Sequence, residues 1–246
     1  MALKVILLGT GDAFGSGGRG HSSVAVVHRG RTILLDCGAS LLPAAEQVDL
    51  DLSGLVAVGL THAHGDHIAG WPFLRLHYQY LHPRSEPLTL VGPPGVDRVL
   101  EQLATLLYPE LDTGGPGYEV VFHPVSDGSV VAVEDAELRA VAVTHQRDHP
   151  AVGYRLSWGG RTVAFSGDAT WSEALVELAS EADLFICECN DFEGTNPVHL
   201  SYRQLEANAD RFTCQRLLLT HCGPDVLARQ DELAWPIAQD GQVIEL

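Results

Sequence analysis

Three strongly apolar segments of this chain end in the same dipeptide, threonine followed by histidine. The segments LVAVGL, LRAVAV and RLLL lead directly into Thr61-His62, Thr144-His145 and Thr220-His221. A fourth segment, RTVAFSG, leads into Asp168. Short apolar runs of this kind are typical of buried strands, and functional groups gather in the loops at strand ends. The pattern therefore predicts one sheet edge at which three imidazoles and a carboxylate converge.

The rest of the chain favours sheets covered by helices. β-branched or leucine-rich runs predict strands at residues 4–8, 24–28, 32–36, 55–60, 88–91, 138–144, 154–158, 162–165, 184–188 and 217–220. Helical patterns follow Asp66 and cover residues 95–107, 172–180, 202–212 and 225–233. A Pro/Gly-rich stretch at residues 112–117 is expected to be a surface loop, and no low-complexity linker divides the chain. We therefore expect an α/β protein in which residues 1–246 form one domain.

The charge balance is strongly acidic. The 32 acidic residues outnumber the 15 basic ones, which gives a formal net charge of -17. Each contact with a nucleic-acid phosphate needs a cationic group, so this balance argues against a broad nucleic-acid surface. It does not argue against a small anionic substrate, because bound metal ions would dominate the local field.

The apolar runs and the cysteines indicate the compartment. No apolar run is long enough to span a bilayer, and the opening segment MALKVILLGTGDAF does not resemble a signal peptide. Five scattered cysteines, an odd number, fit reduced thiols, and Cys187 and Cys189 are expected to pack in the core. We therefore expect a cytoplasmic protein without membrane association.

Residues 61–70 read THAHGDHIAG and place four residues that can bind a metal, three histidines and one aspartate, within six positions. In an extended loop, side chains two apart point the same way, so His62 and His64 can bind one ion. Asp66 and His67 follow a glycine, where the chain can turn into a helix and face a second ion. The alternative is a polar loop with Asp66 as a helix N-cap. Three further residues of these two types at strand ends favour the metal site.

The motif His-x-His-x-Asp-His after a strand resembles the metallo-β-lactamase superfamily, whose fold is a four-layer αββα sandwich with the metal site at one edge of its sheets. Matching residues follow in order, namely His145, Asp168 within SGDA and His221 within LTHCGP. Within the superfamily the chain is most similar to ribonuclease Z and its short phosphodiesterase relatives. That similarity rests on LLGTGDAFG, LLDCG, HPAVGYRL and HLS, together with Glu188. It extends from about residue 4 to residue 225.

The resemblance implies a ligand set for two divalent cations. The first site would contain His62, His64 and His145, the second Asp66, His67 and His221, and Asp168 would bridge them. Zinc is the expected metal, and manganese or iron also fit these ligands. Two cations about 3.5–4 Å apart share a water, lower its pKa and hold a phosphate, so the shared hydroxide would attack phosphorus or a carbonyl carbon. With four positive charges against two carboxylates, the site would attract an anionic substrate.

Three residues are expected to take part in the chemistry. Asp66 would orient the nucleophile. His199 would protonate the leaving alkoxide as general acid, since a histidine titrates near neutral pH. The resemblance implies that Glu188 orients His199 and keeps it protonated. Without Glu188, His199 would be read as a surface or capping residue at the start of the helix near residue 201.

Two neighbours of the expected ligands remain open. His149 lies four residues after His145 and competes with it for the first site, although the repeated strand-Thr-His pattern favours His145. Cys222 is adjacent to His221, but nothing in the sequence assigns it to a metal.

The interval between His145 and Asp168 decides the expected substrate. Ribonuclease Z enzymes that process tRNA typically carry a long Gly/Pro-rich arm there, whereas this chain has 22 residues, which one hairpin accounts for. We therefore expect hydrolysis of a small phosphodiester, cyclic ones included, and set tRNA 3′ processing aside. Hydrolysis of a carboxylic ester, lactone or thioester on the same metals is the second hypothesis. A non-catalytic carrier or metal-binding protein is the third.

The expected partners follow from that choice. They are a small anionic substrate, with no membrane and no extended nucleic acid. Homodimers are common in the group that the chain resembles, so a homodimer is also considered, although the sequence carries no interface signal of its own.

Overall fold

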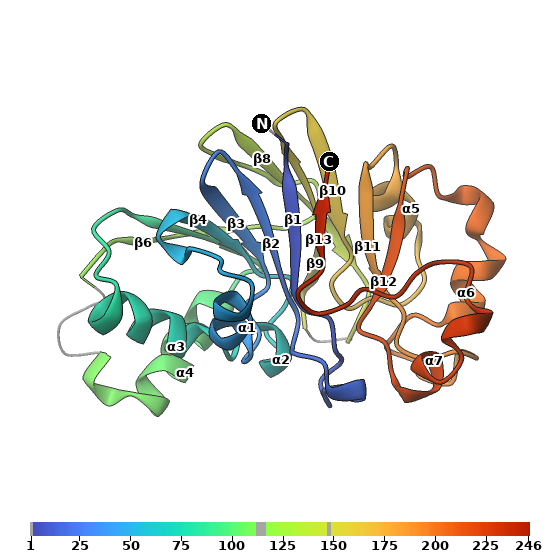
Figure 1. Ribbon diagram of the computed structural model, residues 1–246, viewed down its shortest axis with the longest axis horizontal. Coiled ribbons are helices and arrows are strands. Elements are labelled where there is room, and N and C mark those ends of the chain that lie inside the picture. The colour runs from blue at the N-terminus through green and yellow to red at the C-terminus, as the bar shows by residue number, and fades with distance from the viewer. Residues whose placement is uncertain (1, 112–116, 147–148) are drawn as a thin grey trace.

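Two β-sheets packed face to face form the centre of the molecule, and helices cover their outer faces (Figure 1). The computed structural model describes residues 2–111, 117–146 and 149–246, so most of the loop expected at 112–117 lies outside the described residues. The seven-stranded sheet has the order β13 (Val243–Glu245), β1 (Lys4–Gly9), β2 (Ser23–His28), β3 (Arg31–Leu35), β4 (Leu55–Gly59), β5 (Leu88–Gly92) and β6 (Val120–Pro124). Strands β3 to β6 are parallel neighbours.

The second sheet has six strands. Their order is β12 (Leu217–Thr220), β11 (Leu184–Glu188), β10 (Arg161–Phe165), β9 (Ala151–Trp158), β8 (Ala136–Val143) and β7 (Val130–Val133). Strands β10 to β12 are parallel, and β7 to β10 form antiparallel pairs. Between the sheets lies an apolar layer to which both contribute, with Leu35, Leu138, Tyr154 and Phe165 among its buried members.

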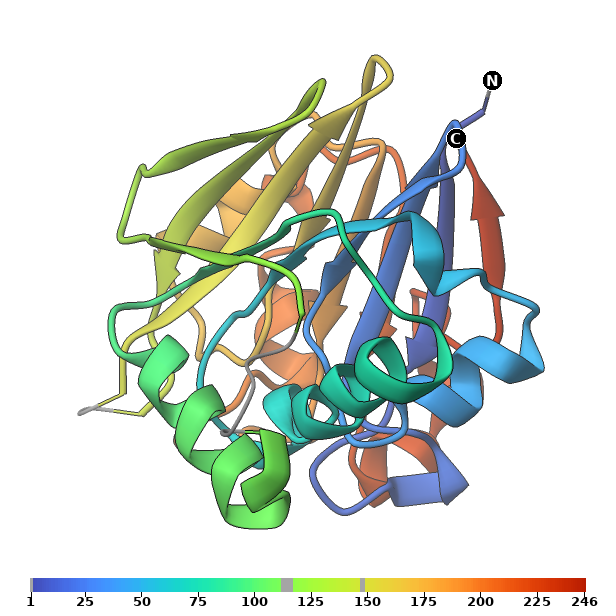
Figure 2. The same cartoon turned by 90° about the vertical axis from the view of Figure 1, so that its left-hand side faces the viewer.

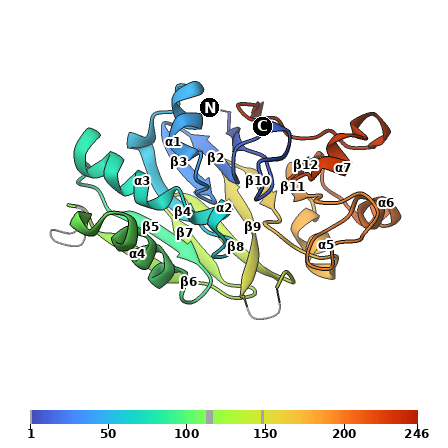
Figure 3. The ribbon, with the colours of Figure 1, turned by 90° about the horizontal axis from the view of Figure 1, so that it is seen from below.

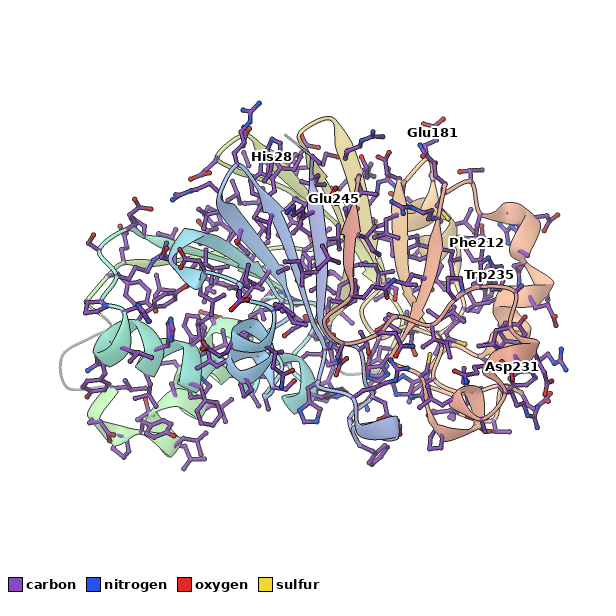
Figure 4. All side chains as sticks on the ribbon, viewed as in Figure 1. His28, Glu181, Phe212, Asp231, Trp235 and Glu245 are labelled. Carbon is purple, nitrogen blue, oxygen red and sulfur yellow. The ribbon has the colours of Figure 1, made fainter. Side chains whose placement is uncertain are left out.

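Helices on the two outer faces complete four layers. The seven-stranded sheet is covered by α1 (Leu41–Gln47), α3 (Trp71–Leu76) and α4 (Val96–Leu107), which Figure 2 shows in front of its lower part. The six-stranded sheet is covered by α5 (Glu173–Ala179), α6 (Tyr202–Ala207) and α7 (Pro224–Leu227). Phe212 and Trp235 pack against that second layer (Figure 4). Among the described residues, no helix is long and apolar enough to cross a membrane.

The predicted α/β sandwich is confirmed, and the ten predicted strands all form. Three further strands, β6, β7 and β13, and one helix, α1, were not expected. The helix expected over residues 202–212 ends at Ala207, and a separate 3-10 turn, Ala209–Arg211, follows it. The helix expected over 225–233 is likewise two pieces, α7 and the 3-10 turn Gln230–Glu232. Cys187 and Cys189 are fully buried, as expected.

One edge of the sandwich collects the carboxyl ends of its parallel strands. The short helix α2 (Gly65–Ile68) follows β4 and lies in the middle of this edge, between the helices of the two outer layers (Figure 3). His28, which ends β2, and Glu181, which precedes β11, are labelled at the opposite edge in Figure 4. Loops that follow β4, β8, β10, β11 and β12 therefore meet around α2.

Candidate metal centre

The seven predicted metal ligands come from four separate parts of the chain and meet at this edge. His62 and His64 belong to the extended segment after β4, and Asp66 and His67 lie in α2. Gly65 opens that helix, so the chain turns between the two pairs. The remaining ligands follow the ends of β8, β10 and β12 and are His145, Asp168 and His221.

The first group of side chains contains three imidazoles and one carboxylate, His62, His64, His145 and Asp168. Their candidate ligand atoms lie within 4.8 Å of one another. Nε2 of His145 is 3.3 Å from Nδ1 of His64 and 3.8 Å from Oδ2 of Asp168. Nε2 of His62 is also 3.8 Å from Oδ2 of Asp168. This donor set suits one divalent cation.

The second group contains Asp66, His67, His221 and the same Asp168. Here it is Oδ1 of Asp168 that faces the histidines, at 3.2 Å from Nε2 of His67 and 3.4 Å from Nε2 of His221. Oδ2 of Asp66 lies 3.3 Å and 3.2 Å from the same two nitrogens. The two oxygens of Asp168 therefore divide between the groups, as a carboxylate bridging two cations requires.

Burial favours the neutral form of the three imidazoles in the first group, which is the form that binds a metal. The pKa of His62 lies well below its usual value, because burial disfavours the imidazolium and His67 adds repulsion. Burial also lowers the pKa of His64 and of His145. A metal binds the neutral form of imidazole, so these rings need not lose a proton first near pH 7.

In the second group, nearby negative charge affects the pKa of the histidines more than burial does. Burial alone would lower the pKa of His67 and His221, yet the charge of Asp168 raises both. Burial alone would raise the pKa of Asp168, but the charges of His221 and His67 hold it well below its usual value. The carboxylates thus stabilise positive charge at this position, which bound cations would supply.

Unpaired buried atoms show that the residues fit metal ions. Although they lie close to oppositely charged or polar neighbours, Nε2 of His62, Nε2 of His67 and Oδ1 of Asp168 are buried and make no hydrogen bond. An unpaired buried polar atom is costly and uncommon in a folded protein. Three of them facing a common space fit a pair of divalent cations, with Asp168 between them.

The far sides of the imidazoles are held by other groups. Asp36 accepts a hydrogen bond of 2.6 Å from Nδ1 of His67, and the carbonyl of Val198 accepts one of 2.7 Å from Nδ1 of His145. The hydroxyl of Thr61 lies 3.0 Å from Nδ1 of His62. Such partners fix the ring so that Nε2 points to the metal.

Asp36 is the functional residue that sequence reasoning missed. It is fully buried, and besides His67 it accepts hydrogen bonds from the amide and hydroxyl of Thr61 at 2.8 Å and 3.0 Å. Asp36 and His221 both adopt positive φ, 62° and 55°, which is uncommon outside glycine and concentrates at functional sites. The available signal was a carboxylate directly after a strand, next to the strand that leads to Thr61.

Glu188 and His199 form a pair at the rim of the cluster. Nδ1 of His199 lies 3.1 Å from Oε2 of Glu188 and 3.9 Å from Oδ2 of Asp168. Glu188 is fully buried, and burial together with the charge of Asp168 raises its pKa well above the usual value. Asp191 holds the loop before His199 by accepting hydrogen bonds from the amides of Gly194, Thr195 and Asn196. The loop thereby presents the His199 ring 4.9 Å from the ring of His145.

The two open neighbours stay outside both ligand groups. His149 is exposed, and its ring centre is 5.8 Å from that of His64. Cys222 is buried, and its thiol donates to the carbonyl of Thr220 instead. Of the two histidines that competed for the first group, His145 is the one in place.

Known proteins resemble the chain over nearly its full length. The family model described as a beta-lactamase superfamily domain matches residues 31–222. Ribonuclease Z of Mycobacterium avium is 28% identical, with 94% of this chain and 89% of that protein aligned. The crystal structure of the short form of human tRNase Z has a TM-score of 0.78 at 24% identity and covers 98% of both chains. Zinc-bound PqqB from Methylobacterium extorquens has a TM-score of 0.76 at 18% identity and covers 99% of this chain and all of that one.

These comparisons correct two expectations. Hydrolysis of a small phosphodiester, with tRNA 3′ processing set aside, is wrong, because relatives aligned along almost the whole chain are named ribonuclease Z. The expected partners, a small anionic substrate in place of an extended nucleic acid, are wrong for the same reason. The absence of a long arm was therefore a poor criterion for setting tRNA 3′ processing aside.

The formal net charge was misleading because it sums charges over the whole chain and does not describe the metal edge. Six acidic residues around the metal edge are buried, and they face the imidazoles or accept hydrogen bonds from their own loops: Asp12, Asp36, Asp66, Asp168, Glu188 and Asp191. With two divalent cations in place, four positive charges would oppose them locally. A whole-chain sum does not describe the charge that a phosphate meets at this edge.

Proposed function

This chain belongs to the beta-lactamase superfamily, and we propose that it is a ribonuclease Z-type endonuclease that removes the 3′ extension of tRNA precursors. It is a metal-dependent hydrolase, as the fold and the ribonuclease Z relatives indicate. The observation that carries the proposal is the division of Asp168 between two complete ligand groups, with the Glu188–His199 pair beside them. We further propose that residues 1–246 form one domain that holds the whole catalytic centre.

Two zinc ions are the proposed cofactor. His62, His64 and His145 would hold one, Asp66, His67 and His221 the other, and Asp168 would contact both. Imidazole and carboxylate are ligands that zinc accepts, and the PqqB structure of the same fold contains zinc. Two divalent cations at this place would supply positive charge for a phosphate and would acidify a water molecule.

His199 would supply the proton for the leaving oxygen. Its Nδ1 faces the buried Glu188, so Nε2 is the atom left to face substrate. A leaving ribose oxygen is a poor leaving group unless a proton reaches it, and a positioned histidine is suited to that transfer. Glu188 would keep the ring oriented and hold a proton on the pair.

Asp66 would orient the attacking water. Its Oδ2 lies between the nitrogens of His67 and His221, so the carboxylate is held at a fixed angle to the second ligand group. Binding of the phosphate between two groups fixed in this way would place the water and the leaving oxygen on opposite sides of phosphorus.

A direct assay tests the proposal. The zinc-loaded protein is incubated with a precursor tRNA that carries a 3′ extension, and the products are resolved on a sequencing gel. One cut at the junction of the tRNA and its extension is expected, and Asp168→Ala should abolish it. Hydrolysis of aryl phosphodiesters by a protein that leaves every precursor tRNA intact would disprove the ribonuclease Z proposal.

A further inference from the structure

A groove of about 620 Å³ lies directly beside the first ligand group. One wall is the Pro93-Pro94 turn after β5, and the other is formed by the end of β8 and by His149-Pro150 before β9. Its size falls in the range of pockets that bind small molecules or single ligand moieties, about 300–1,000 Å³.

The groove exists because β8 continues past its neighbour. Strand β7 pairs with β8 no farther than Arg139, whereas β9 pairs with it as far as Val143. The uncovered side of β8 is closed only by a turn, in which Asp127 accepts a hydrogen bond of 2.9 Å from the amide of Ala142. Ala142 and Val143 therefore keep solvent-accessible apolar surface at the floor of the groove.

The groove and the metal centre share a residue. His145 lines the groove and also belongs to the first ligand group. His149, on the groove wall, has its ring centre 5.8 Å from that of His64. A phosphodiester held at the ligand groups would therefore extend one of its two substituents into the groove.

The lining suits a nucleobase better than a phosphate. The described lining residues include no lysine or arginine, and the one acidic residue among them, Asp127, is exposed. Exposed Pro94 and Pro150 offer flat apolar surfaces, and the imidazole of His149 offers an aromatic one. Unstacked RNA bases bind to such surfaces, histidine included. A neutral, planar and partly apolar group matches the lining residues that the structure describes.

We propose that the groove seats the nucleoside next to the scissile phosphate, with its base against Val143, His149 and Pro150. This inference rests on the proposed ribonuclease function and deepens it, because it assigns a specificity-determining surface to one flanking nucleotide. Ser126 and Gln146, both exposed, lie among the lining residues and can hydrogen-bond to the edge of the base or to ribose.

The test combines changes in RNA and protein. A precursor tRNA is made with an abasic ribose at either of the two positions that flank the cleavage site. For the unmodified protein, one of these substrates should show a KM increase of about tenfold, the size expected for loss of one base-stacking contact. Val143→Trp should fill the groove, raise KM for the intact RNA and make the abasic and intact substrates equivalent, because the same contact cannot be lost twice.

Two further variants make the result specific. Val130→Trp adds the same side chain at an exposed position of β7 outside the groove, and it should keep the full abasic penalty. Pro94→Trp should fill the groove from the opposite wall. It is used in place of Val143→Trp if the Val143→Trp protein no longer binds two metal ions. Cleavage by the unmodified protein with no penalty at either abasic position, or an unchanged penalty in the groove-filling variant, would overturn the groove assignment alone. Failure to cleave any RNA would overturn the ribonuclease proposal and the groove assignment with it.

Discussion

Oδ2 of Asp36 lies 2.6 Å from Nδ1 of His67, although the two residues are 31 positions apart and neither is exposed. The contact leaves Nε2 of His67 facing Oδ1 of Asp168 at 3.2 Å. Asp36 thus acts on the metal centre through a histidine. A carboxylate behind a ligand imidazole fixes the orientation of the ring and increases its basicity.

Asp36→Asn should weaken the second metal site. The amide keeps the shape of the side chain but removes the negative charge behind His67, so affinity for the second zinc ion should fall by about 10- to 100-fold. Dialysis against zinc buffers of graded free concentration, followed by metal analysis, measures this. Asp210→Asn, at an exposed position in the 3-10 turn after α6, is the matched control. Unchanged occupancy in Asp36→Asn would show that the hydrogen bond does not support the ligand.

His199→Ala should separate substrates by their leaving groups. Turnover of precursor tRNA should fall by about 10²- to 10⁴-fold, because the ribose oxygen needs a proton as it leaves. Turnover of bis(p-nitrophenyl) phosphate should change by only a few-fold, because nitrophenolate leaves without protonation. Both rates are measured on the same zinc-loaded preparation. His123→Ala, exposed at the end of β6, should affect neither rate.

An equal loss on both substrates would argue that His199 has a structural role. A rate on precursor tRNA that stays at the level of the unmodified protein would remove the general-acid assignment. Glu188→Gln is a second probe, since it keeps a hydrogen-bond partner for His199 but removes the ionisable carboxyl. It should move the alkaline limb of the pH–rate profile, where a general acid loses its proton, whereas loss of packing alone would not.

Much of the fold follows from local pattern. Strands such as β4 and β12 are short apolar runs that lead into Thr-His. Each pairs with a parallel neighbour, so the carboxyl ends of the paired strands lie at the same edge of their sheet. The missed strand β13 has three residues and forms against β1, so its existence depends on a partner more than 200 positions away. Helix α1 contains Pro43; a proline inside an apolar stretch usually argues against a helix, although the first turn tolerates it.

The site was also only partly visible in sequence. The ligand types in THAHGDHIAG are recognisable because they crowd into ten residues. The role of Asp36 depends on its three-dimensional distance to His67, which no spacing along the chain encodes. The substrate was misjudged because net charge is a property of the whole chain and the length of one interval describes a single loop, whereas phosphate binding depends on the groups at the metal edge.

Removal of metal should abolish cleavage and lower stability. After dialysis against a chelator, activity should disappear and should return on addition of zinc. Zinc at about 100 times its dissociation constant should raise Tm by roughly 5–10 °C, because it binds only the folded ligand groups. Differential scanning calorimetry with and without zinc measures the shift. Asp168→Ala removes the residue shared by both groups and should show little or no shift, while an equal shift in that variant would place the zinc elsewhere.

Asp183 should make stability depend on pH. Its side chain accepts hydrogen bonds of 2.7 Å from Nη1 of Arg161 and 2.8 Å from the amide of Thr162, which ties β10 to the start of β11. Burial alone would raise the pKa of Asp183, but these two donors outweigh it and lower the pKa. The folded protein therefore favours the ionised carboxylate more than the unfolded chain does. The resulting stability is present above the unfolded pKa of about 3.9 and is lost as the pH falls through the lower folded value.

Asp183→Asn should accordingly destabilise the protein by roughly 1 kcal/mol at pH 7, a modest amount because Arg161 is half exposed and solvent screens the pair. The difference from the unmodified protein should shrink as the pH is lowered below about 4, where the carboxylate of the reference protein also becomes neutral. Urea unfolding at a series of pH values, with chelator present throughout so that metal binding does not contribute, measures both effects. Asp231→Asn, at an exposed position, controls for the loss of one negative charge (Figure 4). A difference that stays constant from pH 7 to pH 3 would mean that Asp183 acts through its shape and not through its charge.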